Sequence, residues 1–111
     1  MARLCEMTIS SHFAKDREER CKRINEVLGG DWGEIICKVE DTEKRSKIAI
    51  TDNGLYVVMD TQEKFLITCY LAKYSKAQAL FEKAGKLMPQ ALRQKIGENV
   101  TRYRNLYAEV M

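Results

Sequence analysis

The sequence has one proline, one histidine and six glycines in 111 residues, and it lacks several features that define large classes of protein. So little proline and glycine argues against a disordered or low-complexity chain. No apolar run approaches the ~20 residues that a membrane-spanning helix requires. The segment from Met1 to Met7 lacks the apolar stretch of a signal peptide. We therefore expect one globular domain over residues 1–111, with no membrane partner.

The four cysteines, at Cys5, Cys21, Cys37 and Cys69, are not spaced for metal or redox chemistry. None of them forms a zinc-ligand or Cys-x-x-Cys motif, and the single histidine argues against a zinc site. Cys37 and Cys69 lie inside apolar runs, where a cysteine behaves as a small hydrophobic residue. We expect a reduced, cytoplasmic protein that uses neither a metal nor a cofactor.

The formal net charge of +3 is unevenly distributed along the chain. Residues 73–111 carry eight Lys and Arg against three Asp and Glu, whereas residues 1–72 carry eleven against thirteen. The basic excess therefore lies in the C-terminal third. This distribution is compatible with a polyanionic partner such as RNA but does not require one.

The clearest local signal is a β-hairpin around Asn53-Gly54. Two β-prone runs, Lys47–Thr51 and Leu55–Asp60, stand on either side of this dipeptide. Asn-Gly favours a two-residue type I′ turn, because that turn needs positive φ at both central positions. In the resulting register Lys47 faces Asp60, which is a favourable cross-strand pair of opposite charge.

Other segments complete an α+β pattern. Further strands are predicted over Glu34–Glu40 and Phe65–Leu71, and a helix over His12–Leu28 begins after Ser10-Ser11 and ends at Gly29-Gly30. The capping box from Ser75 to Gln78 predicts a helix to about Ala84. Pro89 suits the first turn of a last helix, whose apolar stripe is Leu92, Ile96, Val100, Tyr103, Tyr107 and Val110. We predict a four-stranded antiparallel sheet with one N-terminal helix and two C-terminal helices.

The type I′ register sorts the strand residues onto two faces of the sheet. The predicted core face carries Ile48, Ile50, Leu55, Val57, Met59, Phe65, Ile67, Cys69 and Leu71. The other face carries Ala49, Thr51, Tyr56, Val58, Leu66, Thr68 and Tyr70. This second face is either a half-exposed surface, favoured by β-propensity alone, or a floor that presents hydroxyl groups to a ligand. In the latter interpretation Thr51 and Tyr56 contact the substrate.

The first predicted helix carries two arginines on its apolar side. Arg17 and Arg20 fall in the same arc as Ile24 and the neighbouring apolar residues, at about 100° per residue. Two interpretations stay open. The arginine stems extend past the sheet to water, or the guanidinium groups line a cleft and bind a phosphate. His12 lies at the edge of the same arc.

These residues suggest a chemistry that needs no metal. No metal motif, phosphate loop or Ser-His-Asp order is present. Metal-independent RNA cleavage needs a base for the 2′-OH, an acid for the leaving 5′-oxygen, and cations for the phosphate. The candidate residues for this reaction are His12, Arg17, Arg20, Thr68 and Tyr70.

The chain has Ser11-His12-Phe13 with Arg17 and Arg20 on its first predicted helix. A predicted four-stranded sheet follows, with Leu66-Ile-Thr-Cys-Tyr70 on its last strand, and this combination resembles a known group. It is similar to the small phage and toxin ribonucleases of the barnase/EndoU/colicin/RelE-like superfamily, over roughly residues 10–71. The resemblance implies His12 as general acid or base and Arg17 or Arg20 as phosphate binders. It implies Thr68 and Tyr70 as groups that position the substrate. The two C-terminal helices are longer than in compact members of that group.

A non-catalytic function is the alternative. The chain would then be a phage-type inhibitor or an antitoxin-like module that binds a cognate protein through its basic C-terminal helix or its tyrosine-bearing sheet face. A third interpretation is an RNA-binding domain that stacks bases on Tyr56 and Tyr70. The apolar stripe of the last helix packs either on the sheet or on a second copy, which would give a homodimer.

Overall fold

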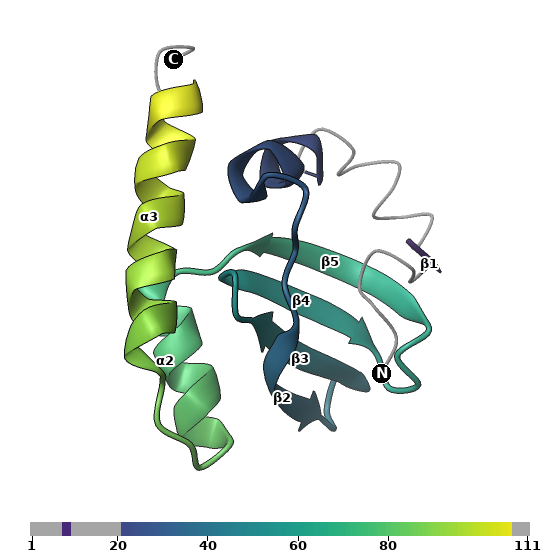
Figure 1. Cartoon of the computed structure of the whole chain (residues 1–111). Coiled ribbons are helices and arrows are strands. Elements are labelled where there is room, and N and C mark those ends of the chain that lie inside the picture. The colour runs from purple at the N-terminus through teal and green to yellow at the C-terminus, as the bar shows by residue number, and fades with distance from the viewer. Residues whose placement is uncertain (1–7, 10–20, 108–111) are drawn as a thin grey trace.

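The computed structural model describes residues 8–9 and 21–107 and shows an α+β domain built on one sheet. The strands are β1 (Thr8–Ile9), β2 (Ile35–Asp41), β3 (Ser46–Thr51), β4 (Leu55–Asp60) and β5 (Phe65–Leu71), and the helices are residues 21–28, α2 (Tyr74–Lys83) and α3 (Gln90–Tyr107). The sheet order is β1-β5-β4-β3-β2 (Figure 1). The predicted four-stranded antiparallel sheet is confirmed as β2–β5, and β1 adds a short parallel strand beside β5.

The hairpin between β3 and β4 forms, but the predicted type I′ turn is wrong. Ile50 pairs with Tyr56 rather than Val57, and Lys47 pairs with Met59 rather than Asp60. Among the turn residues Asp52, Asn53 and Gly54, only Gly54 takes the left-handed conformation, with φ of 84°. Its N–H donates to the Thr51 carbonyl at 3.0 Å. The loop is therefore a three-residue turn that ends in a glycine, and the register is displaced by one residue.

Contacts outside the hairpin explain this turn. The Asp52 Oδ1 accepts from the Glu34 amide at 3.0 Å, and the Asn53 Nδ2 donates to the Asp31 carbonyl. On the other side, Asn99 of α3 donates from its Nδ2 to the Asn53 carbonyl at 2.7 Å. A Cβ at Gly54 would lie 2.7 Å from that same Nδ2, so the position has no room for a side chain.

The shift of register changes which residues share a face. Ile48 and Ile50 lie with Tyr56 and Val58, instead of with Leu55, Val57 and Met59 as predicted. A bulge in β5 between Leu66 and Thr68, and another in β2 between Ile35 and Cys37, change the pattern further. The prediction that a single face of the sheet forms the core is therefore wrong, because each face has its own apolar cluster.

The helix over residues 21–28 covers one side, here called the closed face. Its residues Ile24, Val27 and Leu28 are buried, as the apolar stripe predicted. The sheet residues on this side that are completely buried are Ala49, Thr51, Leu55, Val57, Met59, Leu66 and Cys69. The helix ends at Gly29 and Gly30, with φ of 66° and 81°, which confirms the predicted C-terminus.

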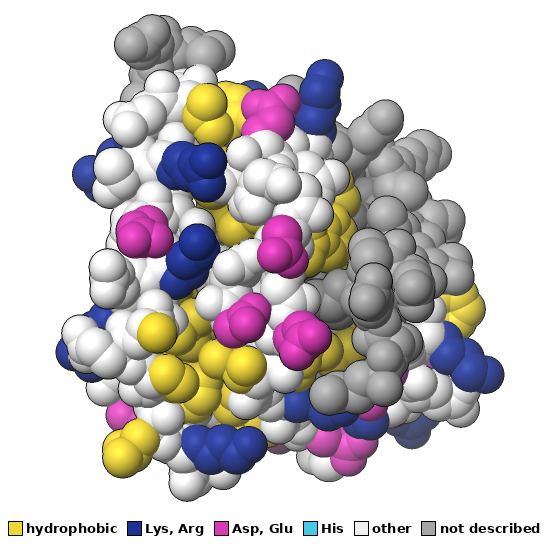
Figure 2. All heavy atoms as spheres, in the orientation of Figure 1, with side chains coloured by type: hydrophobic (Ala, Val, Ile, Leu, Met, Phe, Trp, Pro, Cys, Tyr) yellow, Lys and Arg dark blue, Asp and Glu magenta, His cyan; other side chains and the backbone are white. Residues whose placement is uncertain are grey.

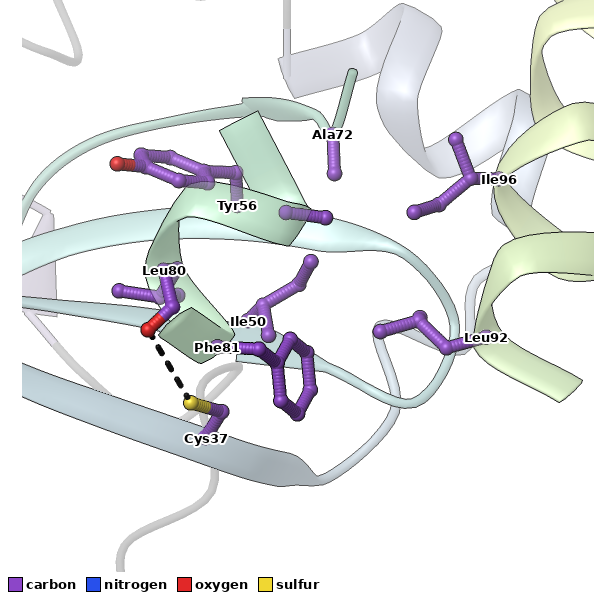
Figure 3. Close-up of a cluster of buried hydrophobic side chains, with 9 residues drawn as sticks. Cys37, Ile50, Tyr56, Ala72, Leu80, Phe81, Leu92 and Ile96 are labelled. Atoms are coloured by element: carbon purple, nitrogen blue, oxygen red, sulfur yellow. Dashed lines mark hydrogen bonds between the residues drawn. The ribbon is translucent and has the colours of Figure 1, made fainter. Parts of the chain in front are cut away.

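Helices α2 and α3 pack on the other side of the sheet. Leu80 and Phe81 of α2 and Leu92 and Ile96 of α3 enclose Ile50 (Figure 3). The predicted capping box is wrong, because the N-cap is Lys73 and no side chain caps the helix. The predicted α3 stripe is right at its first two positions, but Asn99 is buried next, while Val100 is 40% exposed.

The upper half of α3 contacts the helix over residues 21–28 through polar groups, and its lower half lies beside α2 (Figure 1). Arg23 Nη1 donates to the Tyr103 hydroxyl at 3.2 Å, Arg102 Nη1 donates to the Val27 carbonyl at 3.0 Å, and the Tyr107 hydroxyl bonds Glu26. Leu92 and Ile96 of the stripe therefore pack within their own chain, while Val100 is exposed and Val110 lies outside the described residues. Within the described residues, no helix has the length and apolar character needed to cross a membrane.

Candidate functional site

One part of the α2 side of the sheet is only partly covered. Val39, Ile48, Val58 and Thr68 stand directly opposite one another across β2–β5, and all four are only half-buried. Tyr70, the next residue of β5 on this side, is half-buried as well. We call these five residues the open patch. It exists because α2 packs above the neighbouring row, where Cys37, Ile50 and Tyr56 are buried.

The two tyrosines predicted for the site stack on one another. Tyr56 and Tyr70 are paired across β4 and β5, with ring centroids 4.9 Å apart and an angle of 21° between the rings. Figure 3 shows the Tyr56 hydroxyl pointing away from Leu92 and Ile96 of α3. Tyr56 is only 8% exposed. Its ring thus supports Tyr70 more than it contacts solvent.

Burial, followed by the charge and the hydrogen bond of Tyr70, raises the pKa of Tyr56 to about 12. The nearby Asp41 carboxylate acts in the same direction. A hydroxyl with this pKa stays protonated at neutral pH and can donate a hydrogen bond, but it does not act as a base. Tyr56 therefore keeps its hydroxyl proton beside Tyr70, at the edge of the open patch.

Thr68 carries the least satisfied polar atom of the patch. Its Oγ1 is buried, and it has no hydrogen-bond partner in the structure. A buried hydroxyl normally has a partner, and leaving one unmade costs ~1–3 kcal/mol. The Oγ1 has almost no exposed surface, so a ligand on the open patch would gain this hydrogen bond only by moving the neighbouring side chains aside.

The fourth predicted sheet residue lies elsewhere. Thr51 is on the closed face and has no exposed surface. Its Oγ1 accepts from the Leu55 amide at 3.1 Å, inside the β3–β4 turn. The displaced register thus corrects the substrate-contact role predicted for Thr51, because a substrate at the open patch would be on the opposite side of the sheet.

His12, Arg17 and Arg20 lie outside the described residues. The structure therefore brings together Tyr56, Thr68 and Tyr70, and the meeting of these groups with the helix-borne cations remains a prediction. Among residues 8–9 and 21–107, no three His, Cys, Asp or Glu side chains are arranged to hold a metal ion.

Sequence reasoning did not single out two exposed lysines of α2, Lys76 and Lys83. Tyr74 lies under Arg93 of α3, with the guanidinium carbon 4.7 Å from the ring centroid, so this flank of α2 faces α3. At about 100° per residue, Lys76 and Lys83 lie on the flank of α2 opposite Tyr74 and α3. Both lysines are exposed. The spacing of Lys76 and Lys83 from Tyr74 is visible in the sequence, but the position of α3 is needed to tell which flank of α2 they occupy.

The remaining basic residues do not form one block on the face seen in Figure 2. In that view Lys and Arg are spread along α3, with acidic side chains between them. Arg102 is held by the Val27 carbonyl, and Arg93 stacks on Tyr74, so both guanidinium groups already have intramolecular contacts. The predicted basic interface on the last helix is therefore less continuous than its composition implied.

The far end of the patch is acidic. Asp41, Ser46 and Asp60 form the next row across β2–β4. Asp60 accepts two backbone hydrogen bonds at 2.7 Å, from Lys64 and Phe65, and the Phe65 bond is the main cause that lowers the pKa of its carboxyl. The β4–β5 turn therefore stabilises the ionised form of Asp60. Asp41 and Asp60 therefore border one end of the open patch.

Comparisons with protein-family models, with curated proteins and with solved structures found no match.

Proposed function

We propose that the protein is a metal-independent endoribonuclease whose RNA substrate lies across the open patch. The observation that carries the proposal is the Thr68 hydroxyl, which is buried without a partner beside Tyr70 on a half-exposed part of the sheet. The Thr-x-Tyr motif on β5 places both side chains on the same side of the sheet, and Lys76 and Lys83 are exposed on the flank of α2 away from α3. A phosphodiester meets hydroxyl donors and cations on such a surface.

The proposed reaction uses the single histidine of the chain. His12 removes the proton of the 2′-OH, since its ordinary pKa lies near neutrality. The 2′-oxygen then attacks phosphorus, and the bond to the 5′-oxygen breaks with a proton donated by the Tyr70 hydroxyl. Thr68 hydrogen-bonds a phosphate oxygen, and Arg17 and Arg20 bind the phosphate charge. The products are a 2′,3′-cyclic phosphate and a 5′-OH.

The first test is cleavage of RNA in EDTA by the wild type and by His12→Ala. We expect cleavage that survives chelation, and a loss of about 10²–10⁴-fold in rate for the variant if His12 is a general acid or base. End-group analysis should find the cyclic phosphate. Full activity in His12→Ala would remove this residue from the mechanism, and activity lost to EDTA would show that a metal is required.

The second test compares two identical substitutions. Tyr70→Phe deletes a hydroxyl at the open patch, and Tyr74→Phe deletes one on α2, where the ring stacks on Arg93 and is 39% exposed. We expect the cleavage rate to fall at least about tenfold for Tyr70→Phe and to stay unchanged for Tyr74→Phe. Equal rates for the two variants would argue against the open patch as the active site.

Protein binding is the second candidate function, and a specific observation favours it. Val39, Ile48 and Val58 are apolar and half-exposed, and the nearby Phe65 and Ile67 of β5 are 46% and 36% exposed. Apolar groups gathered on one surface are common at interfaces with proteins. If the refolded wild type cleaves no RNA and is not toxic when induced in bacteria, the open patch is better explained as an interface for a protein partner.

A further inference from the structure

The outer edge of β2 has no neighbour among the described residues. β2 is the last strand in the sheet order, whereas the opposite edge, at β5, is paired with β1. β2 is seven residues long, and its pairing with β3 is regular from Cys37 to Asp41. An edge of this length presents unpaired N–H and C=O groups that can hydrogen-bond another strand.

The side chains of β2 are complementary to a second copy of the same strand. Lys38 and Glu40 are exposed, and they stand on either side of Val39, which is half-buried. In an antiparallel pair centred on Val39, Lys38 faces Glu40 of the second copy, and Glu40 faces its Lys38. Opposite charges directly across a strand pair stabilise it by ~0.2–1 kcal/mol each, and like charges destabilise it.

This complementarity selects one register. If two antiparallel β2 strands join into one sheet, residues opposite each other must point to the same side of that sheet. The two-fold axis then passes through a residue position, such as Lys38, Val39 or Glu40, and not between two residues. Centring the pair on Lys38 places two lysines opposite each other, and centring it on Glu40 places two glutamates together. Of these three centres, only Val39 places Lys38 opposite Glu40 in both copies, with the two valines opposite each other between them.

We propose that the protein forms a homodimer in which the β2 strands of two copies pair antiparallel about Val39. The contact is a two-fold, self-complementary interface that extends the two sheets into one. Val39 begins the half-exposed row of the open patch, so the dimer joins the two patches through adjacent valines. This proposal does not depend on the ribonuclease activity.

The existing contact of Lys38 is compatible with this pairing. Its Nζ lies 2.9 Å from Glu63 Oε2 on the β4–β5 turn, and its side chain is 32% exposed. A lysine ammonium has three donors, so it can bond Glu63 and Glu40 of the second copy together. Lysine on an edge strand usually prevents pairing, but here a glutamate two residues away supplies its counter-charge.

The first experiment measures the oligomeric state by sedimentation equilibrium over a wide concentration range. We expect the wild type to dimerise, and Glu40→Lys and Lys38→Glu to dimerise at least about tenfold more weakly, because each places like charges across the pair. An equimolar mixture of the two variants restores opposite charges at both positions. The mixture should therefore dimerise more strongly than either variant alone.

A wild type that stays monomeric at every concentration would overturn the proposal. So would dimers that both charge variants leave intact, because these would point to another surface, such as α3. Circular dichroism of each variant separates loss of pairing from loss of folding, since Lys38→Glu also places a carboxylate beside Glu63.

A second variant gives an independent test that involves no change of charge. Cα atoms directly opposite in an antiparallel pair are about 4.5–5.5 Å apart, within the ~4.4–6.8 Å range that a disulfide spans. Val39→Cys should therefore form a cross-linked dimer under mild oxidation. Ala79→Cys, at an exposed position of α2, is the control. Equal cross-linking of both variants, or none above the wild type, would contradict the proposal.

Discussion

The two sides of the sheet carry similar residues, but the helices bury them to different extents. On the closed face Val57, Met59 and Leu66 have no exposed surface. On the α2 side Val58 and Ile48 are half-buried, one residue away along the same strands. Valine and isoleucine thus stand on both sides, and residue type alone does not show which side is covered. The placement of the helices decides it.

The cover differs because α2 is short and is held at one end of the sheet. The Ala72 amide donates to the Gly54 carbonyl at 2.8 Å, which fixes the start of α2 beside the β3–β4 turn. The helix has ten residues, so it spans about 15 Å. It covers the row of Cys37, Ile50 and Tyr56, while Val39, Ile48 and Val58 in the next row are only partly buried at the edge of this cluster.

The largest expected difference between the two sides concerns their contribution to stability. Val57→Ala on the closed face should lower the free energy of unfolding by ~2–3 kcal/mol, since two buried methyl groups are lost and a cavity is left. Val58→Ala removes the same atoms from a half-exposed position and should cost less than ~1 kcal/mol. Denaturant titrations of the two variants measure this difference directly.

Equal losses at the two positions would contradict the assignment of the closed and open sides. A larger loss for Val58→Ala would mean that the open patch is covered in solution, for example by a second copy. Repeating the titration at several protein concentrations would distinguish this case, because stability would then depend on concentration.

A smaller effect is expected at the rim of the closed face. Glu63 Oε2 lies 2.9 Å from Lys38 Nζ and 3.0 Å from Lys47 Nζ, and these bonds lower the pKa of the Glu63 carboxyl below its ordinary value of 4.5. A lowered pKa in the folded state means that the contribution to stability is present above pH 4.5 and is lost as the pH falls through the folded value.

Glu63→Gln should therefore reduce stability near pH 7 by less than ~1 kcal/mol, because the groups are partly exposed. The difference from the wild type should vanish in acid, and added salt should reduce it at pH 7. Unfolding titrations at several pH values check the sign. A difference that grows as the pH falls would show that the lysine contacts do not stabilise the folded chain.

Local patterns in the sequence were sufficient to predict the elements. The limits of β4 and β5 match the predicted strands, and the helix ending at Gly29 was identified from its glycines. Neither the turn type nor the register could be predicted, because Asp52 and Asn53 are held by Glu34, Asp31 and Asn99, which are distant in sequence. Asn-Gly favours a type I′ turn only when such contacts are absent.

The candidate site was predictable to a similar extent. Alternation along β4 and β5 placed Tyr56, Thr68 and Tyr70 on one side of the sheet, and the structure keeps them together. The predicted Lys47–Asp60 pair is replaced by Lys47–Glu63, since the register differs by one residue. Leu66 moved to the closed face because of the β5 bulge, which had no signal in the sequence.

The central claim, that the open patch carries the activity while the closed face carries stability, is tested most directly by two Thr→Val substitutions. Thr68→Val removes a hydroxyl that has no partner, so stability should hold while RNA cleavage in EDTA falls at least about tenfold. Thr51→Val removes the acceptor of the Leu55 amide, so stability should fall by ~1–3 kcal/mol while the rate per folded molecule is retained. Cleavage that is unaffected by Thr68→Val, or lost in folded Thr51→Val, would contradict the account.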